Sequence, residues 1–183
     1  METSELRIVF LQELWLSHHD QKSLNQYFPE FEFLVATPDM FINNEDKIMT
    51  RGPFWHGCTV GWHRDISNKV TVHQINHERL IGINLHLSKQ TFLLISLYAP
   101  TSGLDEEFLE TISHLSSFLT LHAYSADHVI IGADMNCSPK STRRRQDALN
   151  NFLSTFSLYA HSAPNMSTYA TVVPRPRFTS SNS

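Results

Sequence analysis

The sequence has few cysteines and no long apolar run. Its 183 residues include two cysteines, Cys58 and Cys137, too few for a disulfide framework and typical of a reducing compartment. Its most apolar stretch, Thr91–Leu97, is far shorter than the roughly 20 residues that cross a bilayer. The first residues lack the basic flank and apolar segment of a secretory signal. These absences predict an intracellular protein, nuclear or cytoplasmic, that does not enter a membrane.

Basic residues are in the minority. The chain has 14 Lys and Arg residues and 18 Asp and Glu residues, so its formal net charge is −4. This charge disfavours binding of nucleic acid over the whole surface. We interpret the run Arg143–Arg145 as the solvated start of a helix, which contacts phosphates only if it faces a site. Hydrophobic residues make up 41% of the chain, and no repeat or low-complexity linker interrupts it. We expect a single domain over residues 1–183, in which 162–183 is an irregular tail.

Hydrophobic periodicity predicts most of the secondary structure. The predicted strands are Leu6–Leu11, Phe31–Ala36, Cys58–Trp62, Val70–Ile75, Leu80–Leu87, Thr91–Tyr98 and Val129–Ala133. The predicted helices are His18–Tyr27, Asp105–His122 and Arg144–Leu158. Four strands follow one another without a helix between them, which favours a layered α/β sandwich over a doubly wound parallel sheet.

Polar side chains follow several of these strands at the point where each strand ends. Glu13 follows the first strand, where a carboxylate at the rim of the core can bind a hard cation. Tyr98 ends another strand because Pro100 stops it, and its hydroxyl could donate to a phosphate oxygen. Glu13 could equally be an ordinary solvated acidic residue, and Tyr98 an aromatic residue that packs at the rim of the core. Alone, neither residue identifies a site.

The most informative pattern is the pair Asp134 and Asn136 after the buried strand. In an extended chain, side chains at i and i+2 point to the same side, so the carboxylate and the amide would face one pocket. The carboxylate can orient or deprotonate a water, and the amide can donate to a phosphate oxygen. The same residues also favour an Asx-type turn, which is about equally compatible with the pattern.

Five ordered segments carry a resemblance to a known family. They are Leu11–Trp15, Gly57–Trp62, Glu78–Gly82, Leu94–Pro100 and Ile131–Cys137. In this order they resemble the endonuclease/exonuclease/phosphatase superfamily, and within it most closely the endonuclease domain of non-LTR (LINE-type) retrotransposons. The resemblance implies a four-layer α/β sandwich of the DNase-like type, with two mainly antiparallel sheets flanked by helices.

The resemblance also implies a role for each matching residue. Glu13 would bind a catalytic Mg²⁺, for which Mn²⁺ could substitute. Tyr98 and Asn136 would hold the scissile phosphate, Asp134 would activate the attacking water, and Thr168 would contact substrate. The partner would be DNA, nicked on one strand by a monomeric, metal-dependent domain of a protein associated with a reverse transcriptase.

Two departures from the family pattern qualify this expectation. Family members begin with a strand that carries a metal-site asparagine, and they end with a Ser-Asp-His segment. Glu13 comes too early in the chain to leave room for that strand before it. The chain ends at Ser183, before the position of the Ser-Asp-His segment. We therefore expect a fold incomplete at both termini. Since one acid–base group contributes roughly 10²–10⁴-fold, we expect impaired catalysis. Two alternatives stay open: a catalytically dead relic that binds nucleic acid or protein, and another phosphoesterase of the same fold.

Overall fold

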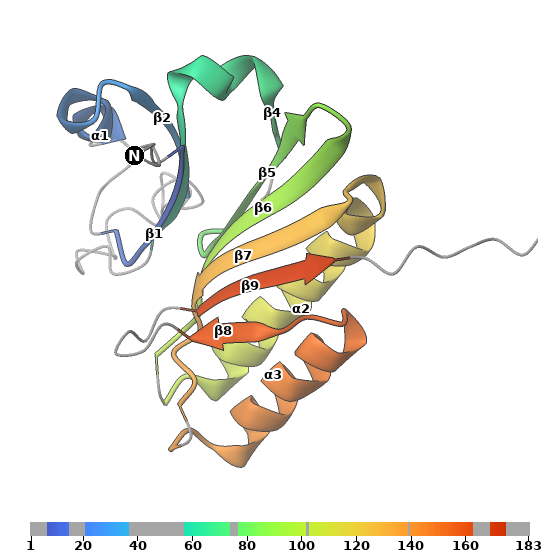
Figure 1. The fold of residues 1–183 in the computed structure, drawn as a ribbon. Coiled ribbons are helices and arrows are strands. Elements are labelled where there is room, and N and C mark those ends of the chain that lie inside the picture. Colours follow the sequence, from blue (N-terminus) through green and yellow to red (C-terminus); the bar gives the residue numbers. More distant parts are fainter. Residues whose placement is uncertain are drawn as a thin grey trace, which may run out of the picture.

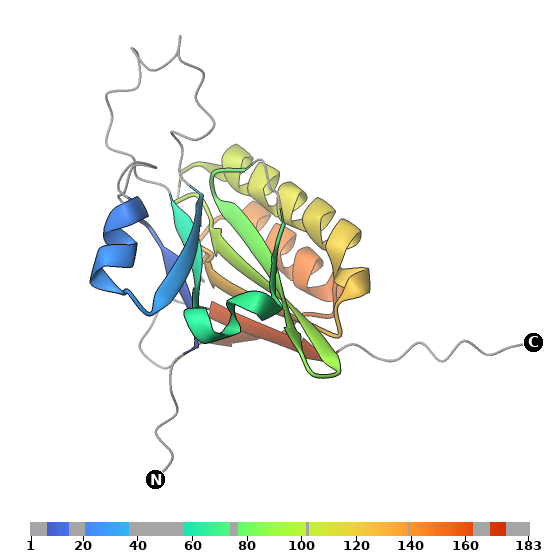
Figure 2. The same cartoon turned by 90° about the horizontal axis from the view of Figure 1, so that it is seen from above.

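Two β-sheets stack face to face in the computed structural model, with helices on the outer side of each (Figure 1). The structure describes residues 7–14, 21–36, 57–73, 77–101, 103–138, 140–162 and 169–174. Seen from above, α1 (Gln21–Tyr27) and the small sheet lie on one side of the large sheet, and the long helices lie on the other (Figure 2). This arrangement confirms the expected four-layer α/β sandwich.

The small sheet contains three antiparallel strands in the order β1-β3-β2. Its strands are β1 (Ile8–Gln12), β2 (Phe31–Ala36) and β3 (Cys58–His63). The register pairs Gln12 and Ala36 with Cys58, so the last residue of β1 lies at the same end of the sheet as the last residue of β2. The opposite end holds the start of β2, where Phe31 pairs with His63.

The large sheet has the strand order β4-β5-β6-β7-β9-β8. Its strands are β4 (Val70–Val72), β5 (Leu80–Leu87), β6 (Gln90–Tyr98), β7 (His128–Asp134), β8 (Ala160–Ser162) and β9 (Tyr169–Pro174). The pair β6–β7 is parallel, and the other pairs are antiparallel. A parallel pair needs a long crossover, which α2 (Asp105–His122) supplies between the two strands. As a result, β6 and β7 end side by side.

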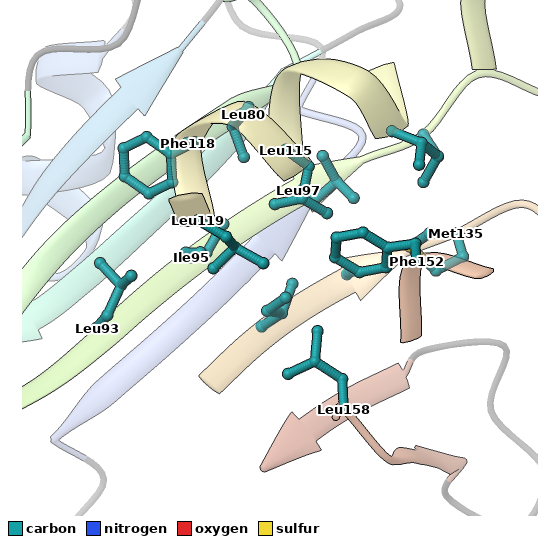
Figure 3. Close-up of a cluster of buried hydrophobic side chains, with 14 of the residues drawn as sticks. Leu80, Leu93, Ile95, Leu97, Leu115, Phe118, Leu119, Met135, Phe152 and Leu158 are labelled. Atoms are coloured by element: carbon teal, nitrogen blue, oxygen red, sulfur yellow. The ribbon is translucent and has the colours of Figure 1, made fainter. Parts of the chain in front are cut away.

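The helices α2 and α3 (Arg143–Thr155) cover the outer face of the large sheet (Figure 1). The apolar stripe predicted for α2 is buried as expected, and its side chains pack on those of β6 (Figure 3). The labelled residues of this cluster are Leu80, Leu93, Ile95, Leu97, Leu115, Phe118, Leu119, Met135, Phe152 and Leu158. Short 3-10 helices, η4 (Arg64–Lys69) and η5 (Ala123–Ser125), follow β3 and α2. Among the described residues, no helix combines the length and apolarity needed to cross a membrane.

A second core lies between the two sheets, where Cys58 and Val60 of β3 meet Ile83 of β5. The sheets approach so closely that a Cβ on Gly132 would lie 2.4 Å from Cγ of Phe10. Glycine is therefore required at this point of β7. The same approach brings the end of β1 against the ends of β6 and β7.

The structure corrects the sequence interpretation in three places. The tail expected to be irregular from residue 162 onward contains β9, which is an inner strand paired with β7. The Tyr, Thr and Val residues of β9 have high β-propensity, although the surrounding Ser and Pro hid this signal in the sequence. The helix expected to end at Leu158 ends at Thr155, and the strand predicted over Val70–Ile75 is described as Val70–Val72.

Candidate functional site

Gln12 connects the two sheets at the end of β1. Its Nε2 donates hydrogen bonds to Oγ of Ser96 on β6, 3.1 Å away, and to the carbonyl oxygen of Gly132 on β7, 3.0 Å away. A half-buried amide that is satisfied in this way fixes the end of β1 over two strands of the other sheet. The next residue, Glu13, is consequently placed at the ends of β6 and β7.

Glu13 is exposed and has a left-handed backbone, with φ of 57°. This conformation is uncommon for a glutamate and turns the chain sharply away from β1. The backbone N–H of Leu14 then donates to the carbonyl oxygen of Gly57, 3.1 Å away, and a Cβ on Gly57 would lie 2.8 Å from the Leu14 oxygen. The glycine therefore permits the close passage that fixes the Glu13 turn.

Tyr98 and Asp134 are register partners at the ends of the parallel strands β6 and β7. One residue further on, the N–H of Ala99 donates to the carbonyl oxygen of Asp134, 2.8 Å away. Toward β5, on the other side of β6, the N–H of Tyr98 donates to the carbonyl oxygen of Arg79, 3.0 Å away. Tyr98 is only 4% exposed, so its position is determined by the sheet rather than by solvent.

Asn136 lies in a turn just beyond β7. Its backbone N–H donates to Oδ1 of Asp134, 3.1 Å away, and its own φ is 44°. Its Nδ2 donates to the carbonyl oxygen of Ala99, 2.8 Å away. The Asx-type turn left open by the sequence is therefore present, and strand alternation does not set the direction of Asn136. The turn nevertheless brings the carboxylate and the amide to the same strand end.

The electrostatics of Tyr98 reflect the charged and polar side chains around it. Burial, first, and then the carboxylates of Glu13 and Asp134 raise the pKa of Tyr98 above its ordinary value. A hydrogen bond with the Asn136 side chain and the guanidinium of Arg79 act in the opposite direction. The Tyr98 hydroxyl therefore keeps its proton at neutral pH and remains a hydrogen-bond donor.

The donors at this strand end suit a hard divalent cation. Glu13 and Asp134 offer carboxylate oxygens, and both act on the same tyrosine hydroxyl. Within the described residues, no group of three or more His, Cys, Asp or Glu side chains forms a closed metal site. Mg²⁺ is characteristically held by one or two carboxylates, with water and substrate phosphate completing its shell. The carboxylates at this strand end therefore fit Mg²⁺, and the part of the chain that the structure describes forms no cage for a metal that needs four protein ligands.

Arg79 is a site residue to which the sequence reasoning gave no role. Its guanidinium carbon lies 5.9 Å from the centre of the Tyr98 ring, and its side chain is paired with Glu78 at 3.7 Å and Glu107 at 3.5 Å. Beside it opens a cleft of about 430 Å³, lined by His77, Glu78, Arg79, Glu107, Glu110, Thr111 and His114. The cleft carries three carboxylates and one permanent cation. Only tertiary packing brings Arg79 to Tyr98, so periodicity gave no signal of it.

The interpretation of Arg143–Arg145 as a solvated helix start is wrong for one of the three. Arg143 and Arg144 are exposed, but Arg145 is 1% exposed. Its guanidinium donates to the carbonyl oxygens of Pro100 and Thr101, in the turn that follows Tyr98. A three-residue basic run contains no signal that singles out its third member. Helical spacing does single out Arg145, because this residue falls on the buried side of α3 with Phe152.

The structure brings four of the five predicted site residues together. Glu13, Tyr98, Asp134 and Asn136 meet at the ends of β1, β6 and β7. The fifth, Thr168, lies outside the described residues. The roles assigned to all five stay predictions.

Solved structures share this fold. The human Nocturnin catalytic domain matches with a TM-score of 0.58 and 13% identity, over 91% of this chain and 68% of that one. The endonuclease domain of TRAS1, a telomere-specific non-LTR retrotransposon, matches with a TM-score of 0.56 and 12% identity, over 90% of this chain and 72% of that one. A mannosyl-6-phosphatase of Bacteroides thetaiotaomicron matches with a TM-score of 0.58 and 14% identity, over 92% and 71%.

The identities of these matches are low, so they establish the fold alone. That fold is the one of endonuclease/exonuclease/phosphatase family proteins, and a domain of a non-LTR retrotransposon is among those that share it. No family model matches the sequence. No curated protein matches it either. An endonuclease domain and a mannosyl-6-phosphatase are both among them, so the common feature is a fold rather than a substrate.

Proposed function

We propose that the chain is a Mg²⁺-dependent phosphoesterase domain that hydrolyses a phosphodiester and nicks DNA. A retrotransposon domain of the same fold is named an endonuclease. The single observation that carries this proposal is that Glu13, Tyr98 and Asp134 lie together where the ends of β1, β6 and β7 are joined. Two carboxylates beside a neutral phenol combine a cation site with a donor for a phosphate oxygen. The shared fold supports the proposal, since it is used by nucleases and phosphatases alike.

Each residue of the site has a distinct task in this proposal. Glu13 holds Mg²⁺, which when bound supplies positive charge against the charge that develops on the phosphate. Tyr98 donates from its hydroxyl to a phosphate oxygen, which its raised pKa permits at neutral pH. The Asn136 amide donates one hydrogen to the Ala99 carbonyl, and its second, which pairs with Tyr98, would pass to a bound phosphate oxygen as a donor without added negative charge.

Asp134 positions the attacking water. Its Oδ1 already accepts the N–H of Asn136, which fixes the carboxylate plane, and Oδ2 is the oxygen we assign to the water. The water oxygen forms a bond to phosphorus as its proton passes to the carboxylate. The phosphorus–oxygen bond to the leaving group breaks, and the leaving oxygen keeps the electron pair and takes up a proton from solvent. Fixing the water in this way supplies the orientation that a free carboxylate would lack.

A second candidate is hydrolysis of a small phosphoester, and the cleft beside Arg79 favours it. Glu78, Glu107 and Glu110 line that cleft, so it repels the continuous phosphate backbone of a nucleic acid. The net charge of −4 has the same consequence at longer range. A compact substrate would place its phosphate at Tyr98 and leave the acidic cleft to a hydroxyl-rich group, as a sugar phosphate would.

A plasmid-nicking assay with Mg²⁺ tests the leading proposal. The wild-type chain is compared with Glu13→Ala and Asp134→Ala, and with Glu30→Ala as a matched control. Glu30 is an exposed glutamate beside Phe31, at the end of the small sheet opposite to Glu13. We expect both site variants to lose roughly 10²–10⁴-fold in nicking rate, whereas the control keeps its rate.

The outcomes separate the two candidates. Nicking that survives both site substitutions would rule out the roles given to Glu13 and Asp134. Turnover of a sugar phosphate without nicking, again lost in both site variants, would replace the nuclease proposal by the small-phosphoester one. Binding of DNA with no turnover of either substrate would favour a binding domain.

A further inference from the structure

Arg145 is a buried cation at the start of α3. Its side chain is 1% exposed, and its guanidinium carbon lies 4.2 Å from the centre of the Phe108 ring. Nη1 lies 3.8 Å from Oδ1 of Asp105, at the start of α2. A buried charge is strongly unfavourable unless it is paired and hydrogen-bonded, so these contacts indicate what the guanidinium does.

The guanidinium holds the turn that follows Tyr98. Nη1 donates to the carbonyl oxygen of Thr101, 2.7 Å away, and Nη2 donates to the carbonyl oxygen of Pro100. Two consecutive carbonyls are therefore bound by one planar group. Lysine, a single point charge on a flexible stem, cannot reproduce this fork.

The same turn is held from its other side by the candidate site. Ala99, the residue before Pro100, donates its N–H to Asp134 and accepts the Nδ2 hydrogen bond of Asn136. Three consecutive carbonyl oxygens, of Ala99, Pro100 and Thr101, thus receive side-chain donors, one from the site and two from Arg145. A shift of this turn moves the acceptor on which the Asn136 amide is oriented.

Thr142 connects the backbone of Arg145 to the Asp105 side chain. Its hydroxyl caps α3 by accepting the N–H of Arg145 and donates to Oδ2 of Asp105, 2.8 Å away. Asp105 is therefore held beside Arg145 by the cap, and the starts of α2 and α3 are joined at one point. The position of Arg145 is set by two helices rather than by its own flexible chain.

We propose that Arg145 is a positioning residue of the candidate site: by binding the Pro100 and Thr101 carbonyls it fixes the Ala99 turn, and through it Asn136 and Tyr98. The predicted effect of Arg145 on turnover rests on the proposed function, whereas its predicted effect on the turn does not. Arg145 touches neither substrate nor metal in this account. It acts through the turn.

The test uses Arg145→Lys, which keeps the charge and loses the fork, beside Arg143→Lys and Arg144→Lys as matched controls. Both control arginines are exposed on the same helical turn. Steady-state hydrolysis of a phosphodiester gives kcat and KM separately. We expect kcat of Arg145→Lys to fall roughly 10- to 100-fold while KM stays within about twofold, and both controls to match the wild type. A folded Arg145→Lys with wild-type kcat would overturn the proposal.

Hydrogen exchange provides a second readout that requires no activity. In Arg145→Lys we expect the Ala99 amide to exchange roughly tenfold faster or more, while amides in the middle of β6 keep their protection. Suppose that the wild type shows no hydrolysis, while the Ala99 amide exchanges faster in Arg145→Lys. The proposed function then fails and the positioning role stands. If Ala99 keeps its protection, or if the whole sheet loosens equally, Arg145 does not act on the turn specifically and the inference fails.

Discussion

Tyr98 and Asp134 stand opposite each other on the parallel strands β6 and β7, and a backbone hydrogen bond of 2.8 Å from Ala99 to Asp134 joins the strands just beyond them. The two side chains therefore lie at one end of the sheet although α2 separates them in sequence. Gln12 brings Glu13 to the same end from the other sheet. The candidate site thus depends on contacts between strands rather than on any single motif.

The first prediction concerns the titration of Tyr98. Glu13→Gln and Asp134→Asn each remove a negative charge that raises the pKa of the Tyr98 hydroxyl, so this pKa falls in both variants. Ultraviolet absorbance of phenolate measures it, with Tyr98→Phe identifying the signal among the five tyrosines. Glu30→Gln leaves the titration unchanged. An unshifted titration in both site variants would show that the carboxylates do not meet at Tyr98.

The second prediction concerns the connection between the sheets. Gln12→Leu leaves the Gly132 carbonyl without its side-chain donor, so we expect the free energy of unfolding to fall by about 1–3 kcal/mol. Urea denaturation measures the change. The matched control Gln90→Leu, at an exposed position on β6, changes the free energy of unfolding by about 0.5 kcal/mol or less. Equal effects of the two variants would contradict the bridging role.

The third prediction concerns the close approach of the sheets at Gly132. Gly132→Ala places a methyl 2.4 Å from Cγ and 2.6 Å from Cβ of Phe10, and a rotamer change cannot move Cβ. We expect a loss of about 3 kcal/mol in the free energy of unfolding. Gly103→Ala is the control, since a Cβ there meets nothing within 4 Å and only its φ of 92° is strained. It is expected to lose about 1 kcal/mol. A smaller loss for Gly132→Ala than for Gly103→Ala would argue against the tight approach.

The fourth prediction concerns pH. Burial, first, and then the charges of His114 and Arg79 lower the pKa of His77 from 6.5 to about 4, while Glu110 opposes them. Glu78 and Glu107 line the same cleft. Because the unfolded chain then binds the proton more readily, the contribution of His77 to stability is present above about 6.5 and is lost as pH falls toward 4.

Urea denaturation at pH values between about 4 and 6.5 checks the direction of this pH dependence. The free energy of unfolding is expected to rise with pH, and the rise is expected to be smaller in His77→Asn, which keeps an acceptor for the Arg79 amide now bound to Nδ1. The exposed His86→Asn serves as control and keeps the wild-type slope. A steeper slope in His77→Asn than in the wild type would show that the imidazole is not held neutral.

Much of this fold could be predicted from the sequence because its signals are local. The apolar stripe of α2 and the buried run of β7 follow from periodicity, and the polar residues at strand ends follow from them. The bonding partners of Arg145 could not be predicted, since they are carbonyl oxygens and Asp105, which lie far away in sequence. The inner position of β9 likewise depends on its pairing with β7. Contacts between distant segments leave no periodic trace.

The central claim is that Glu13 holds a divalent cation at the strand end where Tyr98 and Asp134 lie. Binding of Mn²⁺, followed by electron paramagnetic resonance in the absence of substrate, tests it most directly. Glu13→Gln removes the carboxylate assigned to the cation, so this variant is predicted to weaken Mn²⁺ binding roughly tenfold or more, whereas Glu30→Gln retains the wild-type affinity. Equal Mn²⁺ affinity in the wild type and in Glu13→Gln would contradict the claim.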